Sequence, residues 1–455
     1  MFDRMGQGLA NWSLKWIPSP YIFTVILTLI VFIAGVTAAG ESAVDMVLHW
    51  GGGFFDLLEF SMQMALVLVT GHVVASSKPV MKAIQSVSTL PNSSSQAVVM
   101  IALLAGICGW IHWGFGLIVG AILARDVARQ GYLNGNKMHY PILAGAGYLG
   151  LMVWHGGFSG SAPLTVATEG HFLEEQIGII PIAETLLTPF NLVVSGGLII
   201  IGALFMYLLH PKNKDKFVEI DPGFVQELEE MEKEENNNSE KKSSSVPAEI
   251  LENTPIFTIL IGLAALYYIV WHFATQGFDL TLNIVIFIFL TLGIWFHWKP
   301  MNLVNAVGNA VKGIGGVVLL FPFYAGIQGM MADSGLVMMV AEWFAAVSTE
   351  VTYPFFTLIS AALVNLFVPS GGGQWAVQGP IMMEAAPAIG VTLERTILSV
   401  AYGDQLTNML QPFWAIALLG IVRLRARDII GYTLGVMIFA FIFASLCVMF
   451  LPPMF

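Results

Sequence analysis

Stretches of about twenty apolar residues recur along the whole chain, and they constrain its fold more than any other feature. A stretch of that length lets one α-helix cross the ~30 Å hydrocarbon core of a lipid bilayer. Only 11% of the 455 residues are charged, whereas soluble domains carry about 25%. The sequence therefore predicts an all-α polytopic membrane protein. The predicted apolar segments cover residues 21–39, 54–75, 97–124, 140–168, 177–209, 256–273, 280–298, 306–331, 353–388, 395–420 and 429–451.

Four of these segments are interrupted by glycine and polar residues. Irregular backbone at membrane depth is tolerated only where protein surrounds it or where it lines a water-filled cavity. Two interruptions, GWIHWGFG at Gly109–Gly116 and FVPSGGGQWAVQGP at Phe367–Pro380, predict the tips of re-entrant helical hairpins. The other two, at Trp154–Pro163 and Ala401–Pro412, predict discontinuous transmembrane helices. An alternative is that the glycines only let neighbouring helices pack closely.

The order of the predicted elements repeats in the two halves of the chain. Each half gives a span, a second span, an amphipathic piece, an interrupted hairpin, an interrupted span and a final span. We divide the chain into a first repeat (1–209), an acidic linker (210–253), a connecting transmembrane helix (254–274) and a second repeat (279–455). An odd number of crossings, the connecting helix included, places the second repeat upside down relative to the first. Such inverted repeats bring broken helices together at the bilayer midplane in many transporters.

The distribution of lysine and arginine supports this topology, because basic residues concentrate on the cytoplasmic side of membrane proteins. With the N-terminus inside, the linker is cytoplasmic, the C-terminus lies outside, and Arg395 is the one basic residue that falls clearly outside. The basic residues expected inside include Arg4, Lys15, Lys78, Lys82, Arg125, Arg129, Lys137, Lys212, Lys214, Lys216, Lys299, Lys312, Arg423, Arg425 and Arg427.

The chain offers little chemistry to a soluble enzyme or to a metal cluster. Its two cysteines, Cys108 and Cys447, both lie in apolar segments, so neither a disulfide framework nor a cysteine metal site is available. It has no nucleophile elbow and no phosphate-binding loop. We expect no bound cofactor and no nucleic-acid partner, and we expect the lipid bilayer to surround the protein.

The ionisable side chains deepest in the predicted membrane are His112, His155 and Asp404. Ionisable groups at such depth mark functional sites by default. Gln405 and its neighbours add oxygen atoms that suit a hard cation such as sodium. Two alternatives stay open, since Asp404 could cap a helix N-terminus and the histidines could be hydrogen-bonded structural residues. The candidate residues for sodium or proton coupling are Asp404, Thr407, Asn408, His155 and Gly156.

The two hairpin tips supply the candidate substrate site. A helix N-terminus carries a partial positive charge, so half-helices that begin at the tips attract an anion. Three consecutive glycines at 371–373 disfavour helical structure and leave backbone groups open to a solute. No lysine or arginine lies at the predicted site, which favours a singly charged anion over a dianion. The candidate substrate-binding residues are Ser370, Gly371, Gly372, Gly373, Gln374, His112, Trp113, Gly114, Ser159 and Ser161.

Four tryptophans near the predicted tips and breaks form a further pattern. They are expected to wall an apolar pocket for an acyl chain. The alternative is that they sit at the membrane interfaces, where tryptophan is common. These residues are Trp113, Trp154, Trp375 and Trp414.

Four stretches carry a resemblance to a known family: FPFYAGIQGMM at 321–331, VPSGGGQWAVQGP at 368–380, AYGDQLTNMLQPFWA at 401–415 and GGFSGSAPL at 156–164. There the chain resembles the short-chain fatty acid transporter family, a branch of the ion transporter superfamily that includes dicarboxylate/sodium symporters. The resemblance implies uptake of short acids such as butyrate or acetoacetate across the cytoplasmic (cell inner) membrane. It also implies a homodimer in which a transport domain moves against a scaffold domain, an elevator mechanism.

By the same resemblance, the tip at Ser370–Gln374 and the break at Asp404–Asn408 carry the substrate and cation sites. The dicarboxylate members of the superfamily place Ser-Asn-Thr triplets at their hairpin tips, whereas this chain has SGGG and HWGFG. Their carboxylate contacts therefore do not transfer to this chain. Whether transport is coupled to sodium, to protons or to neither stays open on this ground.

Taken together, the sequence favours a cation-coupled secondary carrier for short-chain monocarboxylates, without enzymatic activity. One alternative is a carrier of the same fold for dicarboxylates or amino acids. A less favoured alternative is a membrane enzyme that uses His112, His155 and Asp404 around a metal, although their spacing matches none of the usual ligand patterns.

Overall fold

The computed structural model describes residues 20–239, 246–366 and 369–452, and within these ranges it contains helices and loops but no β-strand. The predicted cytoplasmic residues Arg4 and Lys15 and two residues of the second hairpin tip, 367 and 368, lie outside the described part. The all-α, multi-pass architecture is confirmed. In the described part of the chain, six helices are by length and composition apolar enough to cross a membrane, namely Leu58–Ala75, Ser94–Ile111, Pro189–Leu209, Pro247–Gln276, Gly315–Asp333 and Ala426–Phe450.

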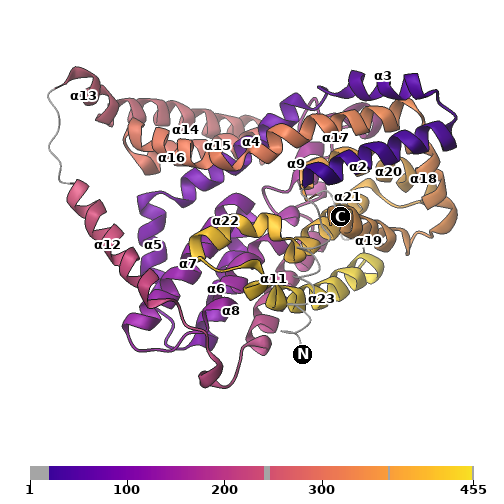
Figure 1. Cartoon of the computed structure of the whole chain (residues 1–455). Coiled ribbons are helices and arrows are strands. Elements are labelled where there is room, and N and C mark those ends of the chain that lie inside the picture. Colours follow the sequence, from indigo (N-terminus) through magenta and orange to yellow (C-terminus); the bar gives the residue numbers. More distant parts are fainter. Residues whose placement is uncertain (1–19, 240–245, 367–368, 453–455) are drawn as a thin grey trace.

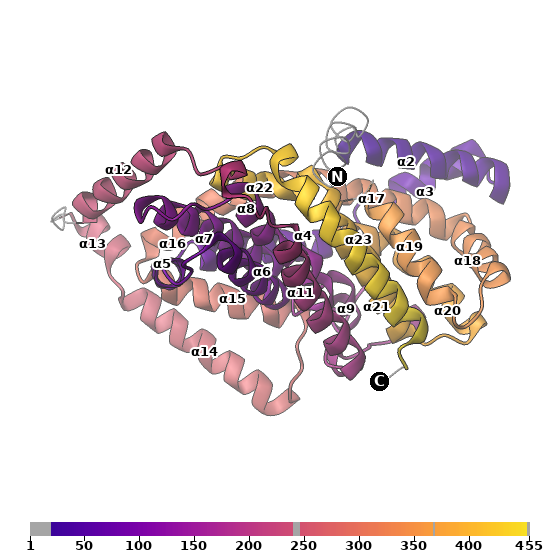
Figure 2. The ribbon, with the colours of Figure 1, turned by 90° about the horizontal axis from the view of Figure 1, so that it is seen from below.

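One layer of helices runs along the upper edge of Figure 1 and is called the upper layer below. Within it, α17 packs against α2, α3 and α4, while α15 and α16 pack against α4. α14 contacts α15 and lies at one edge of the molecule (Figure 2). The upper layer consists of α2 (Pro20–Ala34), α3 (Ala43–Gly53), α4 (Leu58–Ala75), α14 (Ile256–Gln276), α15 (Leu282–His297), α16 (Pro300–Ala310) and α17 (Gly315–Asp333).

The remaining helices form a lower layer that holds two hairpins and two broken helices. The hairpins are α6 (Ser94–Ile111) with α7 (Trp113–Leu133), and α19 (Tyr353–Asn365) with α20 (Gly371–Ile389). The broken helices are α8 (Tyr140–Tyr148) with α9 (Ser161–Val166), and α21 (Leu393–Thr407) with α22 (Pro412–Val422). The lower layer is completed by α11 (Pro189–Leu209) and α23 (Ala426–Phe450), which pack against each other, and by α10 (Glu174–Ile177). Between the layers, α5 (Lys78–Ser88) contacts α7 and α18 (Leu336–Val347) contacts α20.

Glycine lets the first hairpin close and dock on the first broken helix. A Cβ atom on Gly116 would lie 2.3 Å from the backbone nitrogen of Gly109, and one on Gly109 would lie 2.4 Å from the carbonyl oxygen of Gly150. One helical turn after Gly116 in α7, a Cβ atom on Gly120 would lie 2.1 Å from the carbonyl oxygen of Gly147. No side chain fits at such distances, so the three helices touch backbone to backbone.

The second hairpin differs from the sequence-based expectation at its glycines. The sequence predicts unwound backbone at 371–373, but these residues form the first turn of α20. Ser370 caps this turn, because its Oγ atom accepts the N–H of Gly373 at 3.1 Å. The low helix propensity of glycine costs least in a capped first turn, where the leading N–H groups have no helical partner in any case.

The second broken helix is interrupted later than predicted. Asp404 and Thr407 lie inside α21, and the break comes at Asn408–Leu410, which form a 3-10 turn before α22. The two halves are bent by 40°. Asp404 therefore does not cap a helix N-terminus, which was the alternative interpretation of this residue. The first broken helix is interrupted over a longer stretch, from Leu149 to Gly160, that contains two 3-10 turns.

Two predicted spans have other limits in the structure, and one helix was not predicted. The segment 177–209 becomes a loop with Pro181 followed by α11, whose first turn is capped by Thr188. The segment 306–331 is divided by a 3-10 turn at Val311–Gly313, so that α17 begins at Gly315. The helix α3 was not predicted from the sequence, because its eleven residues are too few to cross a membrane.

The linker contains α12 (Pro222–Ser239), at the left of Figure 1, and α13 (Pro247–Asn253), at its upper left, where α13 contacts α16 of the upper layer. The linker therefore carries a charged helix, α12. Its first turns pack on the protein body: Phe224 and Val225 are buried, and the guanidinium of Arg423 lies 4.3 Å from the centre of the Phe224 ring. Arg423 also pairs with Glu227 at 2.5 Å, which ties α12 to the end of α22.

Candidate functional site

A pocket lies where the two hairpin tips, the two broken helices and the upper layer meet. The space inside it that the centre of a water-sized molecule can occupy is about 40 Å³. Its lining is mostly apolar, and the polar side chains among the described lining residues are those of Ser161, Ser370 and Asn408. The lining residues are Met64, Leu68, Trp113, Leu151, Trp154, Ser161, Val317, Phe321, Ser370, Gly371, Gly372, Asn408 and Trp414. Cavities of this kind, apolar with a few polar groups, are typical binding sites for small molecules.

The tip of the second hairpin presents backbone to this pocket. Ser370, Gly371 and Gly372 line it, and the N–H groups of Gly371 and Gly372 have no acceptor among the described residues. A Cβ atom on Gly371 would lie 2.5 Å from Cη2 of Trp154, and one on Gly372 would lie 2.9 Å from Sδ of Met64. The glycines therefore let Trp154 and Met64 pack directly on the backbone of this tip, and any larger residue would displace them.

The other two predicted residues of this tip face the protein interior. A Cβ atom on Gly373 would lie 2.4 Å from Cε2 of Tyr324. Gln374 is fully buried and donates its Nε2 hydrogens to the carbonyl of Ala361 and to Oε1 of Gln378, both at 2.9 Å. Gln374 thus ties α20 to α19 and does not line the pocket.

The tip of the first hairpin contributes an indole wall. Trp113 lines the pocket, and its ring centroid lies 5.2 Å from that of Trp414 and 6.0 Å from that of Trp154. The backbone N–H of Trp113 donates to Oγ of Ser159 at 2.9 Å. Ser159, predicted to bind substrate, is therefore engaged in holding the tip against the first broken helix. Of the two predicted serines there, Ser161 lines the pocket.

His112 and Gly114 belong to the same tip but face the upper layer. The Nδ1 atom of His112 accepts the N–H of Phe115 at 3.3 Å, which caps α7. Its ring is fully buried, 4.0 Å from the ring of Phe289 on α15, and its Nε2 atom has no partner among the described residues. A Cβ atom on Gly114 would lie 3.5 Å from the carbonyl of Leu68 on α4.

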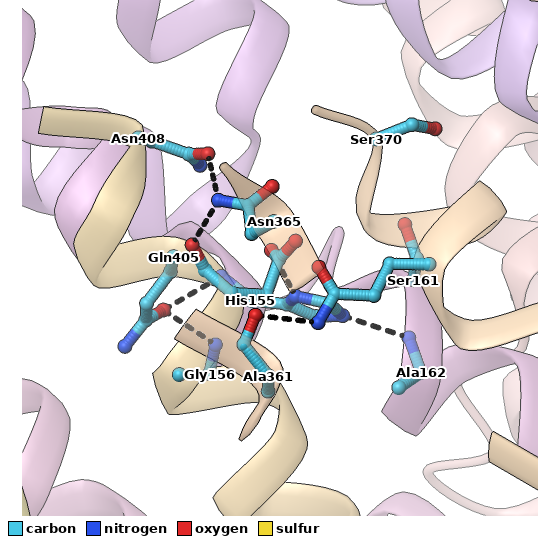
Figure 3. Close-up of polar contacts among 12 residues, drawn as sticks. His155, Gly156, Ser161, Ala162, Ala361, Asn365, Ser370, Gln405 and Asn408 are labelled. Atoms are coloured by element: carbon cyan, nitrogen blue, oxygen red, sulfur yellow. Dashed lines mark hydrogen bonds and ion pairs between the residues drawn. The ribbon is translucent and has the colours of Figure 1, made fainter. Parts of the chain in front are cut away.

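The two broken helices meet in a buried pair formed by His155 and Asp404 (Figure 3). Nδ1 of His155 lies 2.7 Å from Oδ2 of Asp404, and both side chains are 1% exposed. The backbone N–H of Ala162 donates to Nε2 of His155 at 3.0 Å. Because Nε2 is an acceptor, we assign the imidazole proton to Nδ1, which then donates to the carboxylate. The other carboxylate oxygen, Oδ1, is buried and has no partner among the described residues.

Amide side chains hold the backbone on both sides of this pair (Figure 3). Oε1 of Gln405 accepts the N–H groups of His155 at 3.0 Å and of Gly156 at 3.2 Å. Nδ2 of Asn365 lies 2.9 Å from Oδ1 of Asn408, 2.9 Å from Oγ1 of Thr407 and 2.6 Å from the carbonyl oxygen of Asp404. The candidate cation residues therefore form one connected group, of which Asn408 also lines the pocket.

Several residues of this group were not singled out from the sequence. Asn191 donates to the carbonyl of Gly156 at 2.8 Å and accepts the hydroxyl of Tyr402 at 2.8 Å, while Asn365 supports the break in α21. A usable signal existed, because an asparagine inside an apolar segment needs a buried partner. The carbonyl of Gly156 also accepts Nε1 of Trp110 at 2.8 Å, so it is already satisfied by protein donors.

Among the candidate oxygen ligands of a cation, Asp404 is the one carboxylate, and the others are neutral oxygen atoms such as Oγ1 of Thr407 and Oδ1 of Asn408. Among the described residues there is no group of three or more histidine, cysteine, aspartate or glutamate side chains that could hold a metal ion. Asp404 with neutral oxygen donors suits a proton or a singly charged hard cation better than a transition metal, which prefers imidazole and thiolate ligands.

Comparison of the chain with known proteins gives a consistent result. The family model described as "Short chain fatty acid transporter" matches residues 1–451. Two proteins that bear the name "Putative short-chain fatty acid transporter" are similar over almost their whole length. The one from Escherichia coli (strain K12) is 38% identical, covering 97% of this chain and 98% of its own. The one from Haemophilus influenzae is 37% identical, covering 96% and 97%.

Two solved structures share the fold at low sequence identity. The YdaH transporter of Alcanivorax borkumensis superposes with a TM-score of 0.60 at 14% identity, over 95% of this chain and 98% of its own. MtrF of Neisseria gonorrhoeae, from a class of antimetabolite efflux pumps, gives a TM-score of 0.50 at 16% identity, over 98% and 97%. The match of the family model and of both relatives over nearly the full length shows that this chain belongs to the short-chain fatty acid transporter family.

Proposed function

We propose that this protein is a cation-coupled secondary carrier that moves short-chain monocarboxylates, such as butyrate or acetoacetate, across the cytoplasmic membrane. The observation that carries the proposal is the pocket, in which one open helix N-terminus faces a largely apolar chamber. Family membership supports the substrate class, and the names of the two relatives agree with it.

The carboxylate of the substrate is placed at the N-terminus of α20. There the N–H groups of Gly371 and Gly372 and the hydroxyl of Ser370 border the pocket, with Ser161 and Asn408 as further polar groups. A helix N-terminus offers about half a positive charge. Among the described residues, no lysine or arginine lines the pocket. This supports a single carboxylate over a dicarboxylate, whose second charge would have no partner.

The coupling cation is placed at Asp404. Oδ1 of this carboxylate is a buried acceptor without a partner in the described part of the chain, and a buried unpaired acceptor is costly. A proton on Oδ1, or a sodium ion between Oδ1 and the neighbouring amide oxygens, would remove that cost. Because Asn408 borders both the pocket and this group, cation and substrate would stabilise each other's binding.

Reciprocal packing between the two halves supports inverted repeats and alternating access. The second half of each broken helix packs on the hairpin of the other half of the chain, α22 on α7 and α9 on α20. In the upper layer, α4 contacts α15 and α16 as α17 contacts α2 and α3. We infer that the upper layer is the scaffold, that the lower layer moves as an elevator, and that the protein works as a homodimer with its N-terminus inside and its C-terminus outside.

The decisive test uses purified protein in liposomes with labelled butyrate. Counterflow of butyrate without an ion gradient, together with accumulation driven by a sodium or a proton gradient, is the expected result. Separate sodium and proton gradients identify the coupling ion. Accumulation of a dicarboxylate or an amino acid in place of butyrate would support a carrier of the same fold for another substrate. Release of a chemically altered product would point to an enzyme.

A further inference from the structure

We propose that the upper layer selects the chain length of the acid, with Leu68 of α4 and Val317 of α17 closing the apolar end of the pocket. The inference deepens the proposed function and rests on it, since both concern one pocket. It follows from the positions of the pocket residues along the axes of α4 and α17.

The polar end of the pocket lies at the level of Met64. Sδ of Met64 is 2.9 Å from the Cβ position of Gly372 and 3.5 Å from Oγ of Ser161. The ring of Phe60, one turn earlier on α4, lies 3.0 Å from the same Cβ position of Gly372 and 5.8 Å, between centroids, from Phe321 of α17. The N-terminus of α20 therefore meets α4 near Phe60 and Met64.

The apolar end lies one helical turn further along α4, at Leu68. The carbonyl oxygen of Leu68 is 3.5 Å from the Cβ position of Gly114, at the first hairpin tip. Its Cδ2 atom is 3.4 Å from the Cβ position of Gly313, in the turn just before α17. Val317 lies one turn before Phe321 in α17, and therefore at the same end of the pocket as Leu68.

The remaining walls at this end are the indoles of Trp113 and Trp414, whose centroids lie 5.2 Å apart. An acid whose carboxylate sits at Gly371 and Gly372 must therefore direct its alkyl chain toward Leu68. Four residues of α-helix separate Met64 from Leu68, a rise of about 6 Å. That depth accommodates the alkyl part of a short acid, and a longer chain meets the side chains of Leu68 and Val317.

The hairpins and broken helices supply the groups at the polar end, whereas the two side chains that limit length come from the upper layer. Leu68 and Val317 are thus the positions at which chain length can change without disturbing carboxylate binding. A methylene in an apolar pocket is worth about tenfold or more in discrimination between substrates.

The test measures uptake of propionate, butyrate and hexanoate by reconstituted Leu68→Ala, Val317→Ala and Leu68→Phe variants. Each alanine variant is expected to raise the hexanoate-to-butyrate ratio about tenfold, and Leu68→Phe is expected to lower butyrate relative to propionate. The matched controls are Leu66→Ala and Val318→Ala, whose side chains are exposed on the same two helices. Both controls should keep the wild-type ratios.

The outcomes separate this inference from the proposed function. A wild-type protein that transports none of the three acids overturns the function itself. A wild-type protein that transports butyrate, with variants that transport it at unchanged ratios, overturns only the assignment of Leu68 and Val317. Should one alanine variant fail to fold, the other two variants carry the test, since they act from a different helix or add volume at the same position.

Discussion

The two hairpin tips share one plan of construction and present opposite chemistry to the pocket. In each, the residue before the second helix caps that helix: His112 through Nδ1, which accepts the N–H of Phe115 at 3.3 Å, and Ser370 through Oγ, which accepts the N–H of Gly373 at 3.1 Å. After His112 comes the indole of Trp113, whereas glycines follow Ser370. One tip is therefore an apolar wall and the other is an open helix N-terminus.

The difference shows how one site can take an acid with a single charged end. At the first tip, the indole of Trp113 lines the pocket, and the backbone N–H of Trp113 already donates to Oγ of Ser159. At the second tip, the N–H groups of Gly371 and Gly372 remain open among the described residues. A carboxylate is stabilised at one end of the pocket only, and an alkyl chain suits the other end.

The largest expected effect comes from closing the open tip. Gly372→Leu places a side chain against Met64 and Phe60 and fills the pocket, so uptake of butyrate in liposomes should fall at least about a hundredfold. Gly196→Leu is the control, because a Cβ atom there meets nothing within 4 Å. Unchanged uptake by a folded Gly372→Leu protein would place the solute elsewhere.

The second effect concerns the cation group behind the open tip. Asp404→Asn keeps an acceptor for His155 but removes the charge, so accumulation driven by an ion gradient should fall to the equilibrium ratio while butyrate counterflow continues. Glu394→Gln, in the first turn of the same helix, is the control. Wild-type accumulation by Asp404→Asn would contradict the role of this carboxylate in coupling.

A smaller effect is expected from the cap of the open tip. Ser370→Ala removes the acceptor of the Gly373 N–H and a hydroxyl at the pocket, which corresponds to about 1 kcal/mol. The KM for butyrate should rise about fivefold, since 1.4 kcal/mol corresponds to a factor of ten. Ser370→Thr, which can cap the helix in the same way, should restore most of the affinity. An unchanged KM in both variants would argue against carboxylate binding at this tip.

The smallest effect on transport is expected at the closed tip. Ser159→Ala leaves the buried N–H of Trp113 without its acceptor, which costs about 1–3 kcal/mol of stability. The thermal unfolding temperature in detergent should fall, while the KM for butyrate stays close to the wild-type value because Ser159 is not among the residues that line the pocket. A raised KM at unchanged stability would instead give Ser159 a direct contact with the substrate.

The site residues predicted from the sequence fall into two groups, those that face the pocket and those that face neighbouring helices. Ser370, Gly371, Gly372 and Trp113 line the pocket, as does Ser161. His112, Gly114, Gly373 and Gln374 lie at the same tips but face the upper layer or α19, and Ser159 lies in the break of the first broken helix, where it accepts the backbone N–H of Trp113. Sequence spacing located the tips, because glycine and polar residues interrupt apolar segments there. It could not give the rotation of each side chain, which depends on the helix packed opposite.

The polar network around Asp404 is a second feature that the sequence alone did not predict. Asn365 and Asn191 lie in separate apolar segments, and nothing in their local sequence assigns them to the breaks at Asn408 and Gly156. They meet those breaks because helices far apart in the chain are neighbours in the lower layer. Their hydrogen bonds hold irregular backbone in a place where water is scarce, which is the condition under which such backbone is tolerated.

By itself, the sequence determined that this chain is helical, crosses a membrane several times and is broken at four places. The physical reason is that a bilayer leaves the backbone few ways to satisfy its hydrogen bonds. Only the tertiary structure decided that the glycines at 371–373 begin a capped helix, that His155 pairs with Asp404, and that one tip is open while the other is closed. Those features depend on contacts between distant segments, and local composition does not encode them.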